Sequence, residues 1–219
     1  MSLTVKEKIN VLIKLLREPK VFTKLISFRS FGYLVDTGWF NSFKSGESVN
    51  AEFDPIPWFT YPAVDFLHGR LKNNLRVLEF GSGNSTLFLA SQVKQVISME
   101  HNKEWYQKLK PKIAKNTELI FTSCETAVDY LKPFSGLGNF DIIVVDGLFR
   151  NQCIIESVNH LSQDGVIILD DSERNEYNQG IILLRKVGFK QLDFSGISAG
   201  IFFKKCTSIF YKDKNCLDI

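Results

Sequence analysis

A glycine-rich turn is the part of this chain whose residues most directly suggest chemistry. In the segment Val77-Leu-Glu-Phe-Gly-Ser-Gly-Asn-Ser-Thr86 an apolar run leads into two glycines, and a second apolar run starts at Leu87. This order predicts a strand, a tight turn and a helix with almost no spacer. Gly81 and Gly83 have no side chain and tolerate positive φ, so the backbone there can approach a small molecule beyond the carboxyl end of the strand.

A carboxylate follows this turn at the position where a ribose would need one. Glu100 ends the next apolar run, and an acidic side chain there can accept hydrogen bonds from ribose hydroxyls. A dinucleotide fingerprint would require a third glycine where Thr86 stands, to allow close helix–strand contact. A nicotinamide dinucleotide is therefore the weaker choice of ligand.

Three further carboxylates follow two strongly apolar runs. Asp146 ends the run at 140–145, and Asp170 and Asp171 end the run at 166–169. If these runs are neighbouring parallel strands, about 4.8 Å apart, the three acids meet at the carboxyl edge of one sheet. They could then hold Mg²⁺, which takes oxygen ligands and would polarise a substrate oxygen. In the alternative interpretation Asp171 caps the next helix and Asp146 lines the ligand pocket, where it serves as a base or orients an acceptor.

Other polar and aromatic residues near these acids are weaker candidates. Arg150 and Arg174 follow the acids by a few positions, and we expect salt bridges with them rather than contact with an anionic acceptor. Trp58, Thr60 and Tyr61 could close the pocket from the N-terminal side.

The elements that position these residues follow a regular pattern from residue 63 onward. Strands are expected at 75–80, 95–99, 118–122, 140–146 and 165–170, separated by helices at 63–72, 85–93, 103–115, 124–132, 150–162 and 174–186. Alternation of this kind predicts a mostly parallel, doubly wound α/β sheet covered on both faces. Two last strands, 189–194 and 201–211, are joined by six residues, too few for a parallel crossover, so they are expected to form an antiparallel hairpin.

The first 62 residues differ from the rest, and we divide the chain into an N-terminal helical and aromatic arm (1–62) and an α/β domain (63–219). Helices are expected at 4–17 and 20–29, and the aromatic-rich segment 30–62 is expected to be irregular and to pack over the sheet. Residues 1–30 carry seven Lys or Arg against two Glu, which predicts either a solvated face or contact with an anionic membrane surface.

The composition excludes several classes. With 44% hydrophobic and 23% charged residues and a net charge of +3, the chain is an ordinary globular protein, and nucleic acid is not an expected partner. The four cysteines are scattered, which favours neither zinc nor disulfides. No apolar run approaches 18 residues and no secretion signal is evident, so a cytoplasmic location is expected. The oligomeric state is not predicted.

Together these motifs resemble the class I S-adenosylmethionine-dependent methyltransferases over roughly residues 60–211. The residues that carry the resemblance are Val77–Gly83, Val96–Glu100, Phe140–Gly147, Leu161–Asp171 and the final hairpin. The resemblance implies a seven-stranded sheet of order 3-2-1-4-5-7-6 with the last strand antiparallel, and S-adenosylmethionine as cofactor. It implies that the following residues bind this cofactor: Glu79, Gly81, Ser82, Gly83, Asn84, Ser85, Thr86, Glu100, His101, Ser123, Cys124 and Asp146.

Within that cofactor set the resemblance assigns particular roles. Glu79 and the 81–83 turn would hold the methionine part, and Ser85 and Thr86 would bind its carboxylate at the helix N-terminus. Glu100 would bind the ribose, and His101 would lie against the adenine. Ser123 and Cys124 would approach the adenine amino group.

The resemblance also implies a reaction, methyl transfer to a small-molecule acceptor. The acceptor atom is expected to be a hydroxyl oxygen of a sugar or secondary metabolite, with Asp146, Asp170 and Asp171 as catalytic residues. Similarity to catechol, caffeoyl-coenzyme-A and macrolide sugar O-methyltransferases places Mg²⁺ on the same three acids, although Asp171 stands where the catechol type has Asn. The alternatives are a non-catalytic cofactor-binding or interaction module and an NAD(P)-dependent oxidoreductase.

Overall fold

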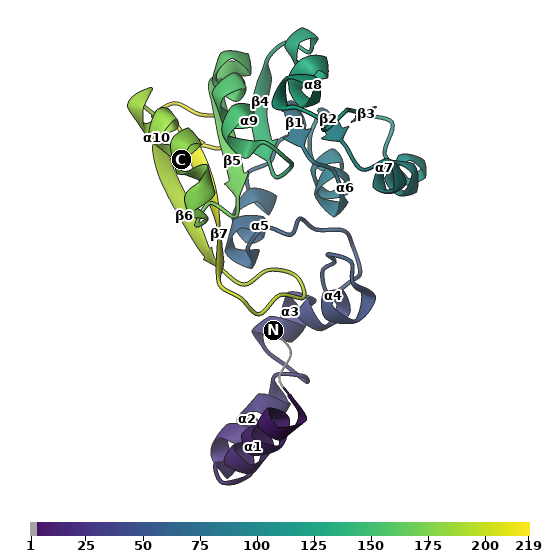
Figure 1. Ribbon diagram of the computed structural model, residues 1–219, viewed down its shortest axis with the longest axis vertical. Coiled ribbons are helices and arrows are strands. Elements are labelled where there is room, and N and C mark those ends of the chain that lie inside the picture. The colour runs from purple at the N-terminus through teal and green to yellow at the C-terminus, as the bar shows by residue number, and fades with distance from the viewer. Residues whose placement is uncertain (1–3) are drawn as a thin grey trace.

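A computed structural model describes residues 4–219 and contains one seven-stranded sheet with helices on both faces (Figure 1). The strands are β1 (Arg76–Phe80), β2 (Gln95–Glu100), β3 (Thr117–Phe121), β4 (Phe140–Val145), β5 (Leu161–Asp170), β6 (Lys190–Gly196) and β7 (Lys205–Tyr211). Their order is β3-β2-β1-β4-β5-β7-β6, and β7 runs antiparallel to both of its neighbours. The expected fold class, strand order and antiparallel last strand are confirmed.

Helices cover both faces of the sheet, and successive side chains of each central strand point to opposite faces, so each face contributes side chains to an apolar cluster. Val77, Ile142 and Val166 belong to one apolar cluster, whereas Leu78 and Ile143 belong to the other. This explains why the central strands are continuously apolar in the sequence rather than alternating.

The helices that cover the sheet are shorter than the sequence pattern suggested. They are α5 (Tyr61–His68), α6 (Asn84–Ala90), α7 (Lys103–Leu109), α8 (Ala127–Leu131), α9 (Arg150–Ser157) and α10 (Asn178–Lys186). Short 3-10 segments occupy Lys110–Lys112, Lys132–Gly136, Val158–His160 and Asn175–Tyr177. Two of these contain Pro111 and Pro133, which cannot donate the backbone hydrogen bond that a continuing α-helix needs.

The arm, here residues 4–62, begins with the two helices that the sequence predicted, α1 (Val5–Leu16) and α2 (Pro19–Ser27). The expectation of an irregular segment at 30–62 was wrong in part, because α3 (Tyr33–Asp36) and α4 (Trp39–Ser45) lie within it. Trp39 is buried against the hairpin loop: its ring centre lies 4.1 Å from that of Phe202, and its Nε1 donates to the Ile201 carbonyl at 3.1 Å. The arm is thereby attached to the sheet domain, residues 63–219.

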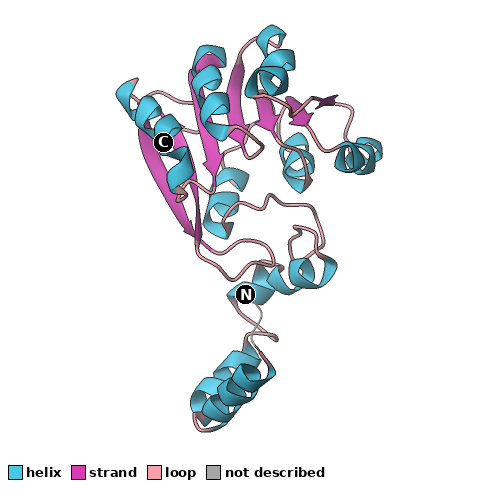
Figure 2. Ribbon diagram, in the orientation of Figure 1, coloured by secondary structure: helices cyan, strands magenta, loops and turns pink. Residues whose placement is uncertain are grey.

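That contact also explains a second correction. The last strand begins at Lys205 rather than at residue 201, because residues 201–204 form the loop against which α4 packs. Figure 2 shows the carboxyl ends of the central strands directed toward the arm. Within the described residues no helix is both long and apolar enough to cross a bilayer.

Candidate functional site

The site is built where three parallel strands end at the same level. Phe80 at the end of β1 is paired with Val145 of β4, and Val145 with Leu169 of β5. This register carries the glycine turn, Asp146 and Asp170 to one edge of the sheet, the edge at which open α/β sheets bind ligands.

Close backbone approach at this edge depends on Gly81 and Gly147. Gly81 has φ +96°, and a Cβ there would lie 3.2 Å from the Gly147 nitrogen. A Cβ on Gly147 would lie 2.3 Å from the Tyr130 hydroxyl and 2.9 Å from the Gly81 nitrogen. Gly83 behaves differently from expectation: its φ of 171° is an extended value that any residue adopts. The special backbone positions are therefore Gly81 and Gly147.

Glu79 stabilises the turn from inside. Its Oε2 accepts hydrogen bonds from the Thr86 hydroxyl at 2.5 Å and the Ser98 hydroxyl at 2.7 Å, and the Thr86 oxygen in turn accepts from the Gly83 amide at 3.0 Å. Burial raises the pKa of Glu79, while the hydroxyl donors act in the opposite direction. Thr86 is fully buried, so its hydroxyl faces this network and not the ligand side of the turn, contrary to its predicted role at a cofactor carboxylate.

Glu100 is held at the rim by its own surroundings. Its Oε1 accepts from the amides of His101 at 2.9 Å and Asn102 at 2.7 Å, and its Oε2 accepts from the Ser82 hydroxyl at 2.7 Å. Two backbone donors thus orient the carboxylate, while the third partner is a side chain that can rotate away. A ribose hydroxyl would replace that Ser82 hydroxyl at Oε2.

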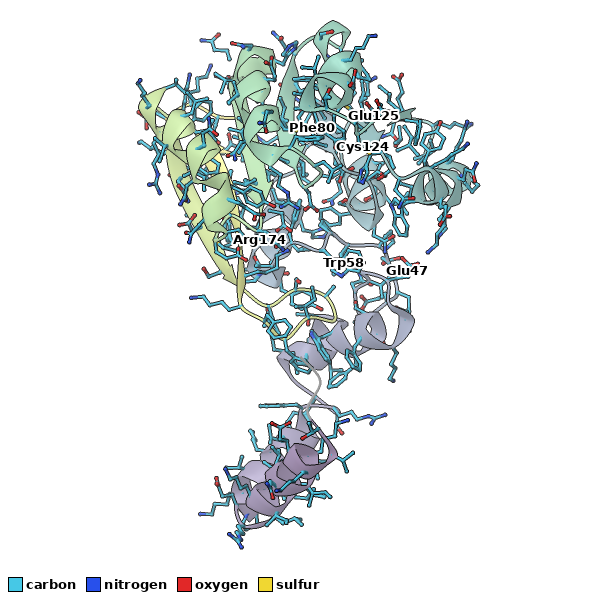
Figure 3. The ribbon with its side chains drawn as sticks, in the orientation of Figure 1. Glu47, Trp58, Phe80, Cys124, Glu125 and Arg174 are labelled. Carbon is cyan, nitrogen blue, oxygen red and sulfur yellow. The ribbon has the colours of Figure 1, made fainter. Side chains whose placement is uncertain are left out.

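Two unsatisfied polar atoms lie on the adjoining part of the rim. The His101 Nδ1 and the Tyr130 hydroxyl are buried and make no hydrogen bond among the residues the structure describes, although His101 Nδ1 lies 3.4 Å from Glu100 Oε1. Such atoms are costly unless a ligand or water serves them. Ser123 and Cys124 are exposed in the loop after β3, on the side of the rim where Figure 3 labels Cys124 and Glu125. Their contact with an adenine stays a prediction.

A cavity of about 250 Å³ separates the glycine turn from the arm. Its lining includes Ser82, Asn84, Ser85, Asp146 and Trp58. The arm is tied to the turn because the Asn84 amide donates to the Ser48 carbonyl at 2.7 Å. In Figure 3 Trp58 and Glu47 lie on the part of the arm that faces the sheet domain.

Trp58 and Trp105 form fixed walls of this cavity. Trp58 is 43% exposed, and its Nε1 donates to the Ala199 carbonyl at 3.1 Å. Trp105 donates from Nε1 to the Ser82 carbonyl at 2.8 Å. The Lys108 ammonium lies over the Trp105 ring, 4.7 Å from its centre, so Trp58 is the wall that leaves a flat apolar face for a ligand.

A larger cavity, about 620 Å³, lies between α5, α6 and the arm and is lined by Tyr61 and His68. Its lining also includes four acids, Asp36, Glu52, Asp54 and Asp65. None of the reactive groups at the carboxyl ends of β1, β4 and β5 is among its lining residues, so we place the candidate site in the smaller cavity. Thr60 lines neither cavity, since it is buried and its hydroxyl donates to the Phe194 carbonyl.

The three predicted carboxylates meet, but each is paired with cationic side chains of the chain itself. Lys205 Nζ lies 2.5 Å from Asp170 and 2.8 Å from Asp171. Arg150 lies 2.9 Å from Asp146 and 3.6 Å from Asp171, and Arg174 lies 2.6 Å from Asp171. The salt bridges predicted for both arginines are confirmed.

This arrangement does not fit Mg²⁺. Within residues 4–219 no group of three His, Cys, Asp or Glu side chains could hold a metal ion. Lys205 stands between Asp170 and Asp171, and Asp146 is turned to Arg150, so the oxygens that a cation would need are already neutralised. The predicted metal role of Asp146, Asp170 and Asp171 therefore finds no support.

Asp146 and Asp170 differ in what they can reach. Asp170 is buried, accepts from Thr207 at 2.7 Å, and does not line the cavity. The Asp146 side chain is 28% exposed and lines the cavity. Burial raises the pKa of Asp146 to about 6, although Arg150 and Lys205 oppose the shift, and burial together with the Asp146 charge raises the pKa of Asp170 to about 7. Asp146 is the acid placed to act on a ligand.

Sequence reasoning missed Trp105, Tyr130 and Lys205 as parts of the site. Trp105 lies in the first turn of α7, shortly after Glu100, and this closeness in sequence could have identified it as a candidate site residue. Lys205 carried no signal, because it lies 35 residues from Asp170 and reaches it only through the antiparallel placement of β7 beside β5.

Comparison with known proteins supports the fold. No protein-family model and no curated protein matches the chain. Among solved structures, it is similar to precorrin-6y C5,15-methyltransferase from Geobacter metallireducens GS-15, with TM-score 0.54 and 15% identity over 68% of this chain and 86% of that one. It is also similar to precorrin 8w decarboxylase from Methanobacterium thermoautotrophicum, with TM-score 0.54 and 18% identity over 77% of this chain and 97% of that one. A third similar structure is spermidine synthase from Thermotoga maritima, with TM-score 0.51 and 15% identity over 69% of this chain and 60% of that one.

These likenesses, with the 3-2-1-4-5-7-6 sheet, define the class I S-adenosylmethionine-dependent methyltransferase fold. The three names describe a methyltransferase, a decarboxylase and a synthase. The fold alone therefore does not decide the reaction, which has to be argued from the site.

Proposed function

We propose that the chain binds S-adenosylmethionine across the rim formed by the glycine turn, Glu100 and Asp146. The observation that carries this is Glu100, a nearly buried carboxylate with two backbone donors on one oxygen and a displaceable Ser82 hydroxyl on the other. The Gly81–Gly147 contact adds a stretch of rim with no side chains. The His101 Nδ1, which makes no hydrogen bond and lies 3.4 Å from Glu100 Oε1, offers a further polar group beside Glu100.

We further propose that the reaction is methyl transfer to a hydroxyl oxygen of a small molecule such as a sugar or secondary metabolite. When bound, S-adenosylmethionine supplies a methyl group attached to a sulfonium. The chain's own part is to align the acceptor and to remove its proton. Trp58 offers an exposed ring against which an acceptor can lie. Asp146 Oδ2 then accepts the hydroxyl proton, while Arg150 holds Oδ1.

Thermal unfolding with S-adenosylmethionine, S-adenosylhomocysteine and NAD in parallel tests the cofactor. A ligand at 100 times its dissociation constant should add about 2.7 kcal/mol to the free energy of unfolding. We expect this shift with the two adenosyl ligands, with or without chelator. A shift with NAD alone would overturn the proposal and favour an oxidoreductase.

A screen of hydroxylated acceptors, read by mass spectrometry for an added methyl group, tests the reaction. Asp146→Asn should keep cofactor binding and lose turnover, because its amide retains an acceptor for Arg150 but removes the base. If the cofactor binds and no acceptor in the screen is methylated, the chain is better described as a cofactor-binding module.

A further inference from the structure

The first two helices form a pair that stands apart from the sheet domain (Figure 1). Thr4 and Glu7 form a reciprocal capping box at the start of α1, and Pro19 begins α2 two residues after the Arg17 cap of α1. The pair is thus specified by local signals. No residue of α1 or α2 is buried.

Each helix nevertheless has an apolar face. On α1, Val5, Ile9, Leu12 and Leu16 recur at helical spacing, and these residues are 74%, 52%, 51% and 59% exposed. On α2 and just beyond it the exposed apolar residues are Val21, Leu25, Ile26 and Phe28. An uninterrupted row of exposed aliphatic side chains of this kind marks an interaction surface.

The remaining surface of the pair is cationic. The basic residues are Lys6, Lys8, Lys14, Arg17, Lys20, Lys24 and Arg29, against Glu7 and Glu18. On a helix of 3.6 residues per turn, Lys14 and Arg17 lie about 170° and about 110° from the centre of the Val5–Leu16 row, whereas Lys6 and Lys8 lie about 90° and about 70° from it, one on each side. Lys14 and Arg17 therefore face away from the apolar row of α1, and Lys6 and Lys8 flank it.

We propose that α1 and α2 bind the surface of an anionic lipid bilayer. A short amphipathic helix of low overall hydrophobicity, with Lys and Arg on its polar side, lies in the plane of the headgroups and inserts its apolar face. The 12 residues of α1 are too few to span the hydrocarbon core, so it lies along the surface. This inference does not depend on the proposed methyl transfer.

Charge favours a bilayer over a second copy of the same helix pair. Two such pairs facing each other would bring like-charged surfaces together, whereas an anionic surface attracts each lysine and arginine. The rival occupant is the acidic rim of the larger cavity in another copy, formed by Asp36, Glu52, Asp54 and Asp65, and the test below separates the two.

The full chain is floated with vesicles of phosphatidylcholine alone and of phosphatidylcholine mixed with phosphatidylserine. We expect binding only to the mixed vesicles, and release when NaCl rises from about 0.1 M to about 0.5 M. Lys20→Glu with Lys24→Glu should weaken partitioning by at least about 25-fold, at about fivefold per lysine. Leu12→Ser with Leu16→Ser should also weaken it.

The matched control is Lys94→Glu with Lys115→Glu, the same charge change at exposed positions of the sheet domain. It should leave partitioning unchanged, and none of these variants should alter the unfolding temperature of the sheet domain, because α1 and α2 contain no buried residue. Equal loss in the control, or no binding of the unmodified chain to anionic vesicles, would refute the proposal. A dimer in light scattering that Lys20→Glu with Lys24→Glu dissolves, without vesicle binding, would assign the surface to a second copy.

Discussion

Replacement of Glu100 by glutamine tests the assignment on which the cofactor proposal depends. The amide keeps an oxygen that can accept from the His101 and Asn102 amides, and it can donate to Ser82 in place of accepting from it. We therefore expect the free energy of unfolding to change by less than about 1 kcal/mol. The charge that a ribose would meet is lost.

The size of the effect follows from the two hydroxyls of a ribose. Hydrogen bonds to a charged group contribute about 1.5–3 kcal/mol and those between neutral groups about 0.5–1.5 kcal/mol. Two such exchanges amount to about 2 kcal/mol, which corresponds to an about 30-fold higher dissociation constant. Isothermal titration with S-adenosylmethionine and S-adenosylhomocysteine measures this directly, with urea unfolding of the same sample as the check on folding.

Two variants make the result specific. Glu118→Gln is the same substitution on the exposed side of β3 and should leave the dissociation constant unchanged. Ser82→Ala should keep or improve affinity, because a ribose hydroxyl no longer has to replace the Ser82 hydroxyl. If Glu100→Gln binds within threefold of the unmodified chain while unfolding normally, Glu100 does not hold the ribose.

Four further outcomes follow from the same geometry. Gly147→Ala should lower the free energy of unfolding by about 1–3 kcal/mol, because its Cβ would meet the Tyr130 hydroxyl at 2.3 Å; Gly136→Ala, where nothing lies within 4 Å, is the control in a urea titration. Lys205→Met should lower the free energy of unfolding by about 3–5 kcal/mol near pH 7.5, because it leaves a buried carboxylate unpaired. The loss should be smaller near pH 5, where Asp170 can take up a proton, and equal losses at both pH values would contradict this. In the unmodified chain the folded-state pKa of Asp170 is raised to about 7, so its contribution to stability is present below pH about 4 and is lost as pH rises toward 7. Urea unfolding of the unmodified chain and of Asp170→Asn at several pH values measures this dependence of the free energy of unfolding on pH. If Asp146 is the base, its pKa of about 6 predicts that turnover rises with pH through that value, and a flat profile from pH 5 to 8 would argue against the role.

Several elements could be predicted because their signals are local. The glycine turn after an apolar run, the alternation of strands and helices, and the short link before the last strand required only neighbouring residues. Helix ends were predicted less well. The prolines at 111 and 133 interrupt helices that periodicity alone extended, and α3 and α4 escaped notice because they are only four and seven residues long.

In the candidate site, too, the positions of residues could be predicted from the sequence but the contacts of their side chains could not. Glu79, Gly81, Glu100 and Asp146 could be named because each lies within one residue of the carboxyl end of a strand. Their roles could not be separated, because a role depends on which way a side chain points. Thr86 is used to bind Glu79 instead of facing the cavity, and that depends on Ser98 from β2 completing the network.

By itself the amino-acid sequence determined the order of elements, the buried faces of the strands and the edge of the sheet at which we place the candidate site, because hydrophobic periodicity and glycine act over a few residues. Only the tertiary structure decided that Lys205 lies between Asp170 and Asp171, where a metal ion was predicted. The physical reason is that β7 inserts antiparallel beside β5, which places a distant lysine against two buried carboxylates. A charge balance of that kind depends on the position of side chains in space, and no spacing along the chain encodes it.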